Sequence, residues 1–125
     1  MAENPKPGDI KERTFNFAVA IVRLCAELSE RPGVSRNLSY QLLNSATSIG
    51  ANVEEAQAGQ SRADFVSKYG IALKEARETI YWLRLLEASG QLSGEKVQTL
   101  RREAEEISRI IGAIIVHAKS NNARK

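Results

Sequence analysis

The chain has few of the residues that most often carry catalysis, metal binding or cross-links. Its 125 residues include one cysteine, one histidine and one tryptophan. A single cysteine excludes an internal disulfide, and a reducing compartment is the default for such a chain. Cys25 lies in an apolar run, where a buried structural thiol is expected. His117 follows an isoleucine-rich run, and we expect it at the surface or at its boundary.

Motifs for metal binding and catalysis are missing as well. No Cys/His set exists for zinc, and neither a phosphate-binding glycine loop nor a serine nucleophile elbow occurs. Glu54, Glu55, Glu75 and Glu78 would suit a carboxylate-bridged di-metal site, but such sites need a Glu-x-x-His pair on each of two helices, and no histidine stands at that spacing. We therefore expect no catalytic residue, no metal, no cofactor and no enzymatic activity.

Long apolar runs and a large excess of one charge are also missing. No stretch approaches the ~20 apolar residues that span a bilayer, and no hydrophobic signal core begins the chain, which predicts a cytoplasmic protein without a membrane partner. Eighteen basic and fifteen acidic residues give a net charge of +3, a small excess for a dedicated nucleic-acid binder. An apolar share of 42% is ordinary for one globular domain.

Four segments carry apolar residues at helical spacing, and no segment has the alternation of a strand. The expected helices cover approximately residues 10–30, 35–60, 61–89 and 93–119. We expect residues 1–9 to form a flexible leader and residues 120–125 a polar tail. The sequence therefore predicts an all-α chain, an antiparallel up-down-up-down four-helix bundle over residues 10–119.

Caps and apolar faces follow from the same pattern. N-caps are expected at Ser35, Ser61 and Ser93, and a left-handed residue at Gly59, while Ser89 and Gly90 end the third helix. The first helix has two adjoining apolar seams, namely Phe15, Ala18, Val22 and Cys25, and Phe17, Ile21, Leu24 and Leu28. The apolar lines of the second and fourth helices are Leu38, Leu42, Ala46, Ile49, Val53 and Ala56, and Val97, Leu100, Ala104, Ile107, Ile111, Ile114 and Ala118.

The third helix has apolar residues on two sides. Its expected core face consists of Phe65, Tyr69, Leu73, Ala76, Ile80 and Leu83. Trp82 follows Leu73 by nine residues, which at ~100° per residue places Trp82 on the opposite side, together with Ile71 and Leu85. A patch containing tryptophan predicts a subunit interface. The alternative is that Trp82 lies beneath the leader or a neighbouring loop.

A polar stripe runs between these two faces, formed by Lys74, Arg77, Tyr81 and Arg84. Three cations around an aromatic ring would bind phosphates and stack a base. The fourth helix would extend this candidate nucleic-acid surface with Arg101, Arg102 and Arg109. In the alternative interpretation the cations are paired and solvated, Lys74 with Glu78 and Glu105 with both Arg101 and Arg109, and Tyr81 packs at the interface.

The second helix contains a line of small and polar residues, including Ser48, Asn52 and Glu55. Small residues permit close approach of a neighbouring helix, and buried polar groups must be hydrogen-bonded. We interpret the three residues as a polar packing node, within the bundle or between subunits. The alternative is a direct ligand role for Asn52 and Glu55.

Residues 41–56, QLLNSATSIGANVEEA, followed by Phe65 and by residues 71–76, IALKEA, resemble the bacterial four-helix-bundle family named for proteins encoded in intervening sequences of 23S ribosomal RNA genes. The most specific part is the Ser-Ile-x-x-Asn-x-x-Glu pattern that begins at Ser48. Many members have proline at the position of Gly50. Many also have a glycine-rich turn with a basic residue at positions 56–60, and Arg62 is the nearest substitute for that cation here.

The resemblance implies a homopentameric ring with a central channel and no enzymatic activity. It also implies a relation to the accessory variability determinant of diversity-generating retroelements, a basic pentamer that works with a reverse transcriptase and nucleic acid. We therefore expect a non-enzymatic oligomer that binds nucleic acid, RNA in preference to DNA. The alternative is a structural or protein-interaction scaffold with no nucleic-acid role.

Overall fold

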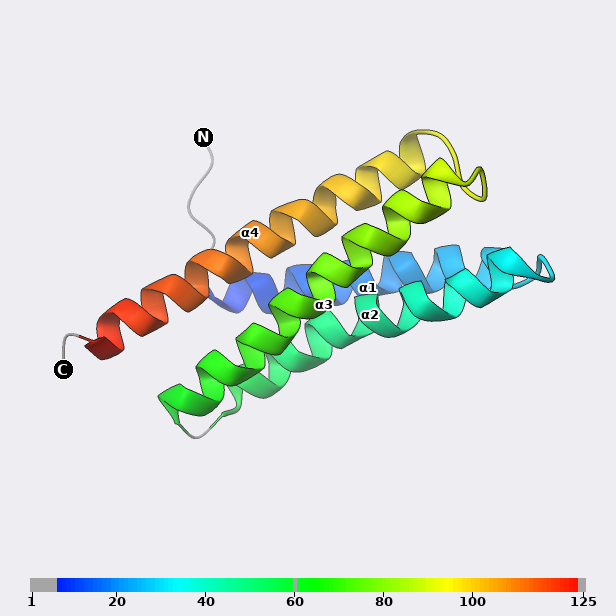
Figure 1. Cartoon of the computed structure of the whole chain (residues 1–125). Helices are drawn as coiled ribbons and strands as arrows, with labels where there is room; N and C mark the ends of the chain where they lie inside the picture. The colour runs from blue at the N-terminus through cyan, green and yellow to red at the C-terminus, as the bar shows by residue number, and fades with distance from the viewer. Residues whose placement is uncertain (1–6, 60, 124–125) are drawn as a thin grey trace.

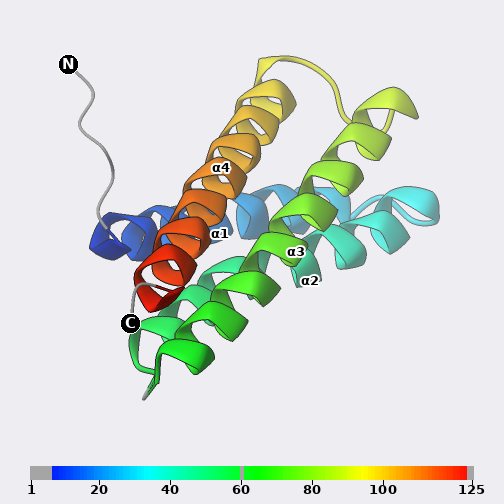
Figure 2. The same cartoon turned by 60° about the vertical axis from the view of Figure 1, so that its left-hand side comes forward.

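Four helices make up the computed structural model, which describes residues 7–59 and 61–123. The helices are α1 (Pro7–Leu28), α2 (Val34–Gln57), α3 (Arg62–Ala88) and α4 (Glu95–Ala123). This part of the chain contains no strand, which confirms the all-α prediction. The start of α1, the α2–α3 turn and the end of α4 lie at one end of the molecule (Figure 1, Figure 2), so consecutive helices are antiparallel. Each helix packs against the next, and α1 also packs against α4.

The outer ends of the first and last helices reach further than predicted. α1 begins at Pro7 and α4 ends at Ala123, so residues 7–9 of the expected leader and 120–123 of the expected tail are helical. Proline suits the first helical turn, where its missing N–H would have no intrahelical partner. Asp9 adds negative charge to that turn, which the helix dipole favours. The remaining parts of the two expected flexible segments, residues 1–6 and 124–125, lie outside the described residues.

Glycine, not serine, immediately precedes α2 and α4. Gly33 has a φ of 91° and Gly94 a φ of 90°, and α2 and α4 begin at the residues that follow them. The predicted N-caps Ser35 and Ser93 are therefore wrong, because these turns use a backbone conformation that favours glycine. Ser35 is buried in the first turn of α2 and donates a hydrogen bond to Gln91 Oε1. Gly59 lacks the predicted positive φ.

Both predicted ends of α3 are confirmed. The Asp64 N–H donates to Ser61 Oγ over 3.0 Å and so caps the first turn. At the other end, Gly90 has a φ of 80°. The N–H groups of Gly90 and Gln91 donate to the carbonyls of Glu87 and Leu86, which is the Schellman arrangement.

The hydrophobic core draws on every helix. The predicted apolar lines of the second and fourth helices face it, with only Leu38 and Ile114 half-buried. In α1 one predicted seam is buried, whereas Phe15 and Val22 of the other seam are 58% and 48% exposed. The two adjoining seams of α1 are therefore not buried together. The core, formed where α1 meets α2 and α4, takes up the second seam, and of the first seam only Cys25 is buried.

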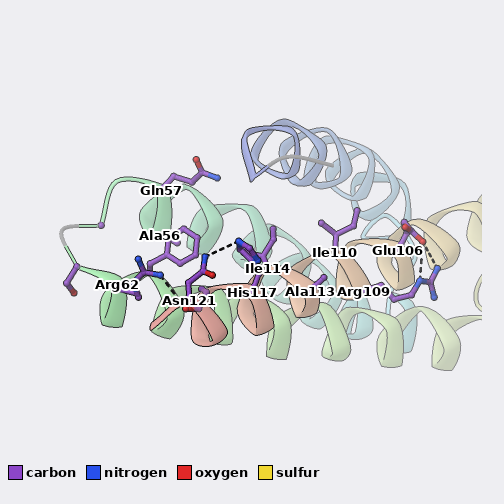
Figure 3. Close-up of a pocket in the computed structure, with 14 residues that line it drawn as sticks. Ala56, Gln57, Arg62, Glu106, Arg109, Ile110, Ala113, Ile114, His117 and Asn121 are labelled. Atoms are coloured by element: carbon purple, nitrogen blue, oxygen red, sulfur yellow. Dashed lines mark hydrogen bonds and ion pairs between the residues drawn. The ribbon is translucent and has the colours of Figure 1, made fainter. Parts of the chain in front are cut away.

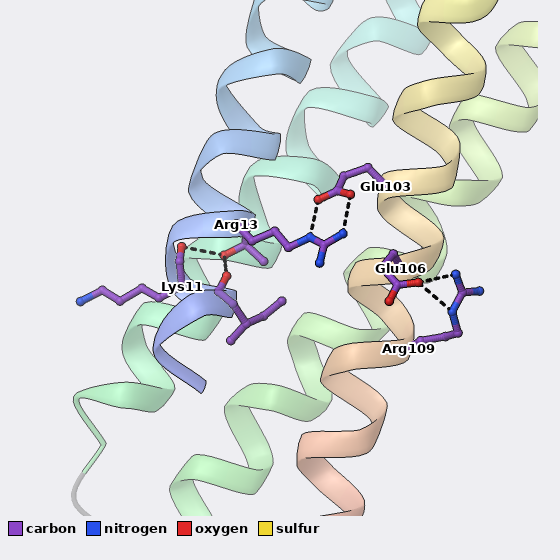
Figure 4. Close-up of polar contacts among 7 residues, drawn as sticks. Lys11, Arg13, Glu103, Glu106 and Arg109 are labelled. Atoms are coloured by element: carbon purple, nitrogen blue, oxygen red, sulfur yellow. Dashed lines mark hydrogen bonds and ion pairs between the residues drawn. The ribbon is translucent and has the colours of Figure 1, made fainter. Parts of the chain in front are cut away.

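The contacts of α1 with its two neighbours differ in kind. On the α2 side the helices approach closely at Gly50, where an added Cβ would lie 3.4 Å from the backbone oxygen and Oγ1 of Thr14. On the α4 side a groove of about 730 Å³ remains. Arg13 crosses it and donates two hydrogen bonds of 2.7 and 2.8 Å to the carboxylate of Glu103 (Figure 4). Donation to the Glu103 carboxylate stabilises the charged guanidinium and raises the pKa of Arg13 above its ordinary value.

The buried face of α3 is rotated from the predicted one. The buried residues of α3 are Tyr69, Ala72, Ala76, Thr79, Leu83 and Leu86. Phe65, Leu73 and Ile80 of the predicted face are only half-buried. The prediction missed Ala72 and Thr79 because alanine and threonine are weak apolar signals, and it also missed Leu86. Thr79 Oγ1 lies 2.9 Å from Ser45 Oγ of α2, so a polar contact occupies the middle of this face.

Candidate functional site

The polar stripe predicted on α3 lies on one exposed face. Lys74, Arg77, Tyr81 and Arg84 are all exposed. None of the three cations forms an ion pair within residues 7–59 and 61–123, so the alternative pairing of Lys74 with Glu78 does not occur there. Their charges are therefore open to a ligand.

A hollow of about 420 Å³ adjoins the stripe. It is lined by Tyr81, Arg84, Leu85, Glu87, Ala88 and Arg101. Tyr81 is 54% exposed, and its ring meets that of Trp82 edge-on, with centroids 5.1 Å apart. Arg101 donates to Glu87 Oε1 over 2.7 Å, a contact between α4 and α3 that replaces the predicted pair with Glu105. The hollow thus combines an aromatic wall with one guanidinium that has no carboxylate partner in the described chain.

The other two predicted cations lie apart from the stripe. Arg102 and Arg109 line the groove between α1 and α4. Arg109 donates two hydrogen bonds of 3.1 and 2.6 Å to Glu106, so its predicted pair with Glu105 is wrong. This interaction lowers the pKa of Glu106. The structure therefore brings Arg101 next to the α3 stripe and places Arg102 and Arg109 elsewhere.

The spacing of Trp82 from Leu73 predicts that Trp82 lies on the fully outward side of α3, and this prediction is wrong. Trp82 is half-buried and packs against the core. Leu73 lies at the edge of the buried face, and from the centre of that face Trp82 is only about 90° away. Lys68 lies two heptads before Trp82 and therefore on nearly the same side of α3. Because Lys68 contacts Glu55 of α2 over 3.1 Å, Trp82 lies on the flank of α3 beside α2. Of the other predicted interface residues, Leu85 is half-buried and Ile71 is 40% exposed.

The polar node of α2 is hydrogen-bonded largely within its own helix. Ser48 Oγ donates to the carbonyl of Asn44 over 2.7 Å, and Asn52 Nδ2 donates to the carbonyl of Ser48 over 2.8 Å. Glu55 reaches Lys68 of α3. A contact of this node with another subunit or a ligand stays a prediction.

A pocket that the sequence did not predict lies where the C-terminal half of α4 passes the α2–α3 turn (Figure 3). Its volume is about 990 Å³. Its apolar lining residues are Ala56, Phe65, Ile110, Ala113, Ile114 and Ala118. Its polar lining includes Arg62, Glu106, Arg109, His117 and Asn121. The lining comes from two stretches, residues 56–65 and 106–121. The sequence had singled out Arg62 and Arg109 as candidate ligand-binding cations, but it did not bring them into one pocket, because these stretches are far apart in the chain.

The buried titratable groups are accounted for by packing. Burial raises the pKa of the Cys25 thiol to about 11, and its Sγ donates to the carbonyl of Ser39 over 3.4 Å. Burial also raises the pKa of Tyr69, whose hydroxyl accepts a 3.0 Å hydrogen bond from Gln57. Burial, with Glu78 nearby, raises the pKa of Glu75.

The described residues contain neither a metal-binding cluster nor a membrane-spanning helix. Over residues 7–59 and 61–123, no three His, Cys, Asp or Glu side chains are grouped so that they would hold a metal ion. None of the four helices, as far as they are described, is both long and apolar enough to cross a bilayer.

Comparison with known proteins identifies the family. No curated protein matches the chain. Among solved structures, a protein of unknown function from the S23 ribosomal protein family of Bacteroides thetaiotaomicron VPI-5482 is similar, with 42% identity and a TM-score of 0.82 over 89% of this chain and 98% of the other. The family described as 23S rRNA-intervening sequence protein matches residues 7–113. This chain therefore belongs to the 23S rRNA-intervening sequence protein family.

Proposed function

We propose that this chain is a non-enzymatic, oligomeric RNA-binding protein and that the exposed stripe of α3 contacts the RNA. The observation that carries the proposal is that Lys74, Arg77 and Arg84 share an exposed face of α3 with Tyr81 and form no ion pairs in the described chain. Cations neutralise phosphates, and an aromatic ring stacks an unpaired base. The hollow beside Tyr81 and Arg84 would receive such a base.

Single-stranded loops of a folded RNA fit this arrangement better than a regular duplex. In loops the bases are splayed out and can stack on an aromatic side chain, whereas an A-form duplex offers mainly its backbone and shallow groove. One tyrosine can stack one base, and two or three cations can bind the neighbouring phosphates, so each subunit would contact one or two nucleotides. We therefore expect a weak contact for each subunit.

Oligomerisation would turn weak contacts into useful affinity. The net charge is +3 for each chain, and a homopentameric ring would repeat the α3 stripe in every subunit. Linked sites bind with an increased effective concentration. Ile71, which is 40% exposed, with the half-buried Trp82 and Leu85, would contribute to the subunit contact. We also propose that this chain is related to the accessory variability determinant of diversity-generating retroelements, which is itself a basic pentamer.

The test is binding of a structured RNA with single-stranded loops, measured by fluorescence anisotropy at low and high salt. We expect the Arg77→Glu/Arg84→Glu double variant to lose most of the affinity of the native chain. The slope of log affinity against log salt concentration should be less steep by about 1.4, because each of the two lost phosphate contacts contributes ~0.7 on single strands. The Lys11→Glu/Arg23→Glu variant changes the net charge by the same amount on α1 and should retain binding.

The control separates the stripe from net charge. An equal loss of binding in both double variants would contradict a specific role for the α3 stripe. Native protein that fails to bind RNA at low salt, or whose affinity does not depend on salt, would contradict RNA binding altogether. In that case a protein-interaction scaffold is the better assignment, and the α3 double variant should then keep its protein partner.

A further inference from the structure

The pocket between α4 and the α2–α3 turn contains a guanidinium with unused donors. A guanidinium carries five N–H donors. Within the described residues Arg62 uses one of them, in a long hydrogen bond of 3.4 Å to the carbonyl of Ala118. No carboxylate forms an ion pair with Arg62 in this part of the chain. Arg62 can therefore bind an anion without breaking an existing ion pair.

The carboxylates near the pocket do not balance this charge. Glu106 pairs with Arg109 over 2.6 Å, and Figure 3 shows this pair at the opposite end of the pocket from Arg62. Asp64, in the same turn as Arg62, does not line the pocket. Its Oδ2 would lie 2.8 Å from a Cβ added to Gly59, so the Asp64 carboxylate packs against the turn. One positive charge at the Arg62 end stays uncompensated.

Between these two ends the wall is apolar. Phe65 of α3 and Ile110, Ala113 and Ile114 of α4 line it. Phe65 and Ile114 are half-buried and Ala113 is exposed, so part of this apolar surface is in contact with solvent. The helix from Ile110 to Ala118 is about 12 Å long. The volume of about 990 Å³ lies at the upper end of the ~300–1,000 Å³ usual for small-molecule sites.

We propose that this pocket binds a small amphipathic carboxylate, with its carboxylate on Arg62 and its apolar chain against Ile114, Ala113 and Ile110. A guanidinium can hold a carboxylate through two parallel hydrogen bonds. Asn121, whose amide is 3.1 Å from His117 Nε2, lies beside Arg62 (Figure 3) and provides a further donor. Removal of apolar surface from water drives the chain into the pocket. The pocket and the α3 stripe share no residue, so this proposal does not depend on the proposed function.

Isothermal titration with decanoate and with 1-decanol tests the proposal on the full chain. We expect decanoate to bind, and Arg62→Gln to weaken it by about tenfold, which is the effect of losing one charge-assisted hydrogen bond. Arg62→Gln should leave 1-decanol binding unchanged, because the alcohol has no charge. Ala113→Phe fills the apolar wall and should weaken both ligands. Arg77→Gln removes an exposed cation of α3 outside the pocket and should weaken neither.

Several outcomes would overturn the assignment. Decanoate binding that falls equally in Arg62→Gln and Arg77→Gln reflects net charge, and binding that Ala113→Phe leaves intact occurs elsewhere on the protein. Absence of binding by folded native protein up to about 1 mM ligand would exclude a useful site. A decanoate affinity that falls as the protein concentration rises would mean that a second copy of the chain, and not a small carboxylate, occupies the pocket. Thermal unfolding followed by circular dichroism checks that each variant is folded.

Discussion

Individual glycines in this chain have different physical roles. Gly50 lets α1 approach α2, because a Cβ there would already touch Thr14. Gly90 adopts a positive φ in the turn after α3, where any other residue would be strained. Gly70 lies within α3, and nothing is within 4 Å of a Cβ added to it. Glycine at position 70 therefore has no role that the single chain explains, and it costs helix stability.

We predict that Gly70→Ala and Gly90→Ala have opposite effects on stability. Gly70→Ala should raise the free energy of unfolding by about 0.5–1 kcal/mol through helix propensity. Gly90→Ala should lower it by about 1–2 kcal/mol, because a Cβ disfavours the left-handed conformation. Urea unfolding followed by circular dichroism measures both. Loss of stability or of assembly in Gly70→Ala would mean that this part of α3 is covered in the native protein.

Two ion pairs join α1 to α4, and they differ in how far solvent reaches them. A groove of about 730 Å³ remains between the two helices, and the Arg13–Glu103 ion pair crosses it with side chains only 36% and 31% exposed. The Lys96–Glu27 pair, also between α4 and α1, has side chains 61% and 69% exposed. Solvent screens the second pair more strongly, and its flexible side chains lose more freedom on pairing.

We predict a larger coupling energy for Arg13–Glu103 than for Lys96–Glu27. Double-mutant cycles with alanine should give about 1 kcal/mol for the first pair and about 0.3 kcal/mol or less for the second. Chemical denaturation of the single and double variants with urea provides the values. High salt should reduce the second coupling further. Equal couplings would show that the bidentate geometry contributes nothing to the contact between α1 and α4.

The whole molecule leaves large apolar side chains in solvent on several helices. Phe15 and Val22 of α1, Tyr40 of α2 and Ile71 of α3 are each 40% exposed or more. Scattered exposed apolar residues are normal for a monomer, so exposure alone does not define an interface. Trp82→Ala is an ambiguous test of assembly, because Trp82 packs against the core of its own chain. Ile71 is the better probe, since its side chain is more exposed.

We predict that native protein forms a pentamer of the 13.8 kDa chain and that Ile71→Glu yields smaller species. A charge on the proposed contact would be buried without a partner, and this disfavours association. Val116→Glu, at a position of α4 that is 68% exposed, is the matched control and should leave the mass unchanged. Multi-angle light scattering gives the masses. A native monomer would refute both the interface and the ring.

The four helices and the two ends of α3 were predictable because their causes are local. Apolar spacing, the Ser61 cap and the Gly90 turn all act within a few residues of chain. The faces of α1 and α3 were predicted less well, since the positions of neighbouring helices decide which seam is buried. Phe15 and Val22 match the apolar pattern of α1 yet face solvent. Thr79 does not match the pattern of α3 yet is fully buried against Ser45.

The candidate sites also differ in whether they depend on one helix or on the packing of several. Lys74, Arg77, Tyr81 and Arg84 share one helix, so their common face follows from the helical period alone. The partners of Arg101 and Arg109 and the pocket at Arg62 depend on how α4 lies across α3 and the α2–α3 turn. The helices, the Ser61 cap and Gly90 turn of α3, and the polar stripe follow from the sequence alone, because they need only neighbours along the chain. Which charges are paired and where apolar surface stays open depend on the packing of the helices, because both require segments that are far apart in sequence to meet.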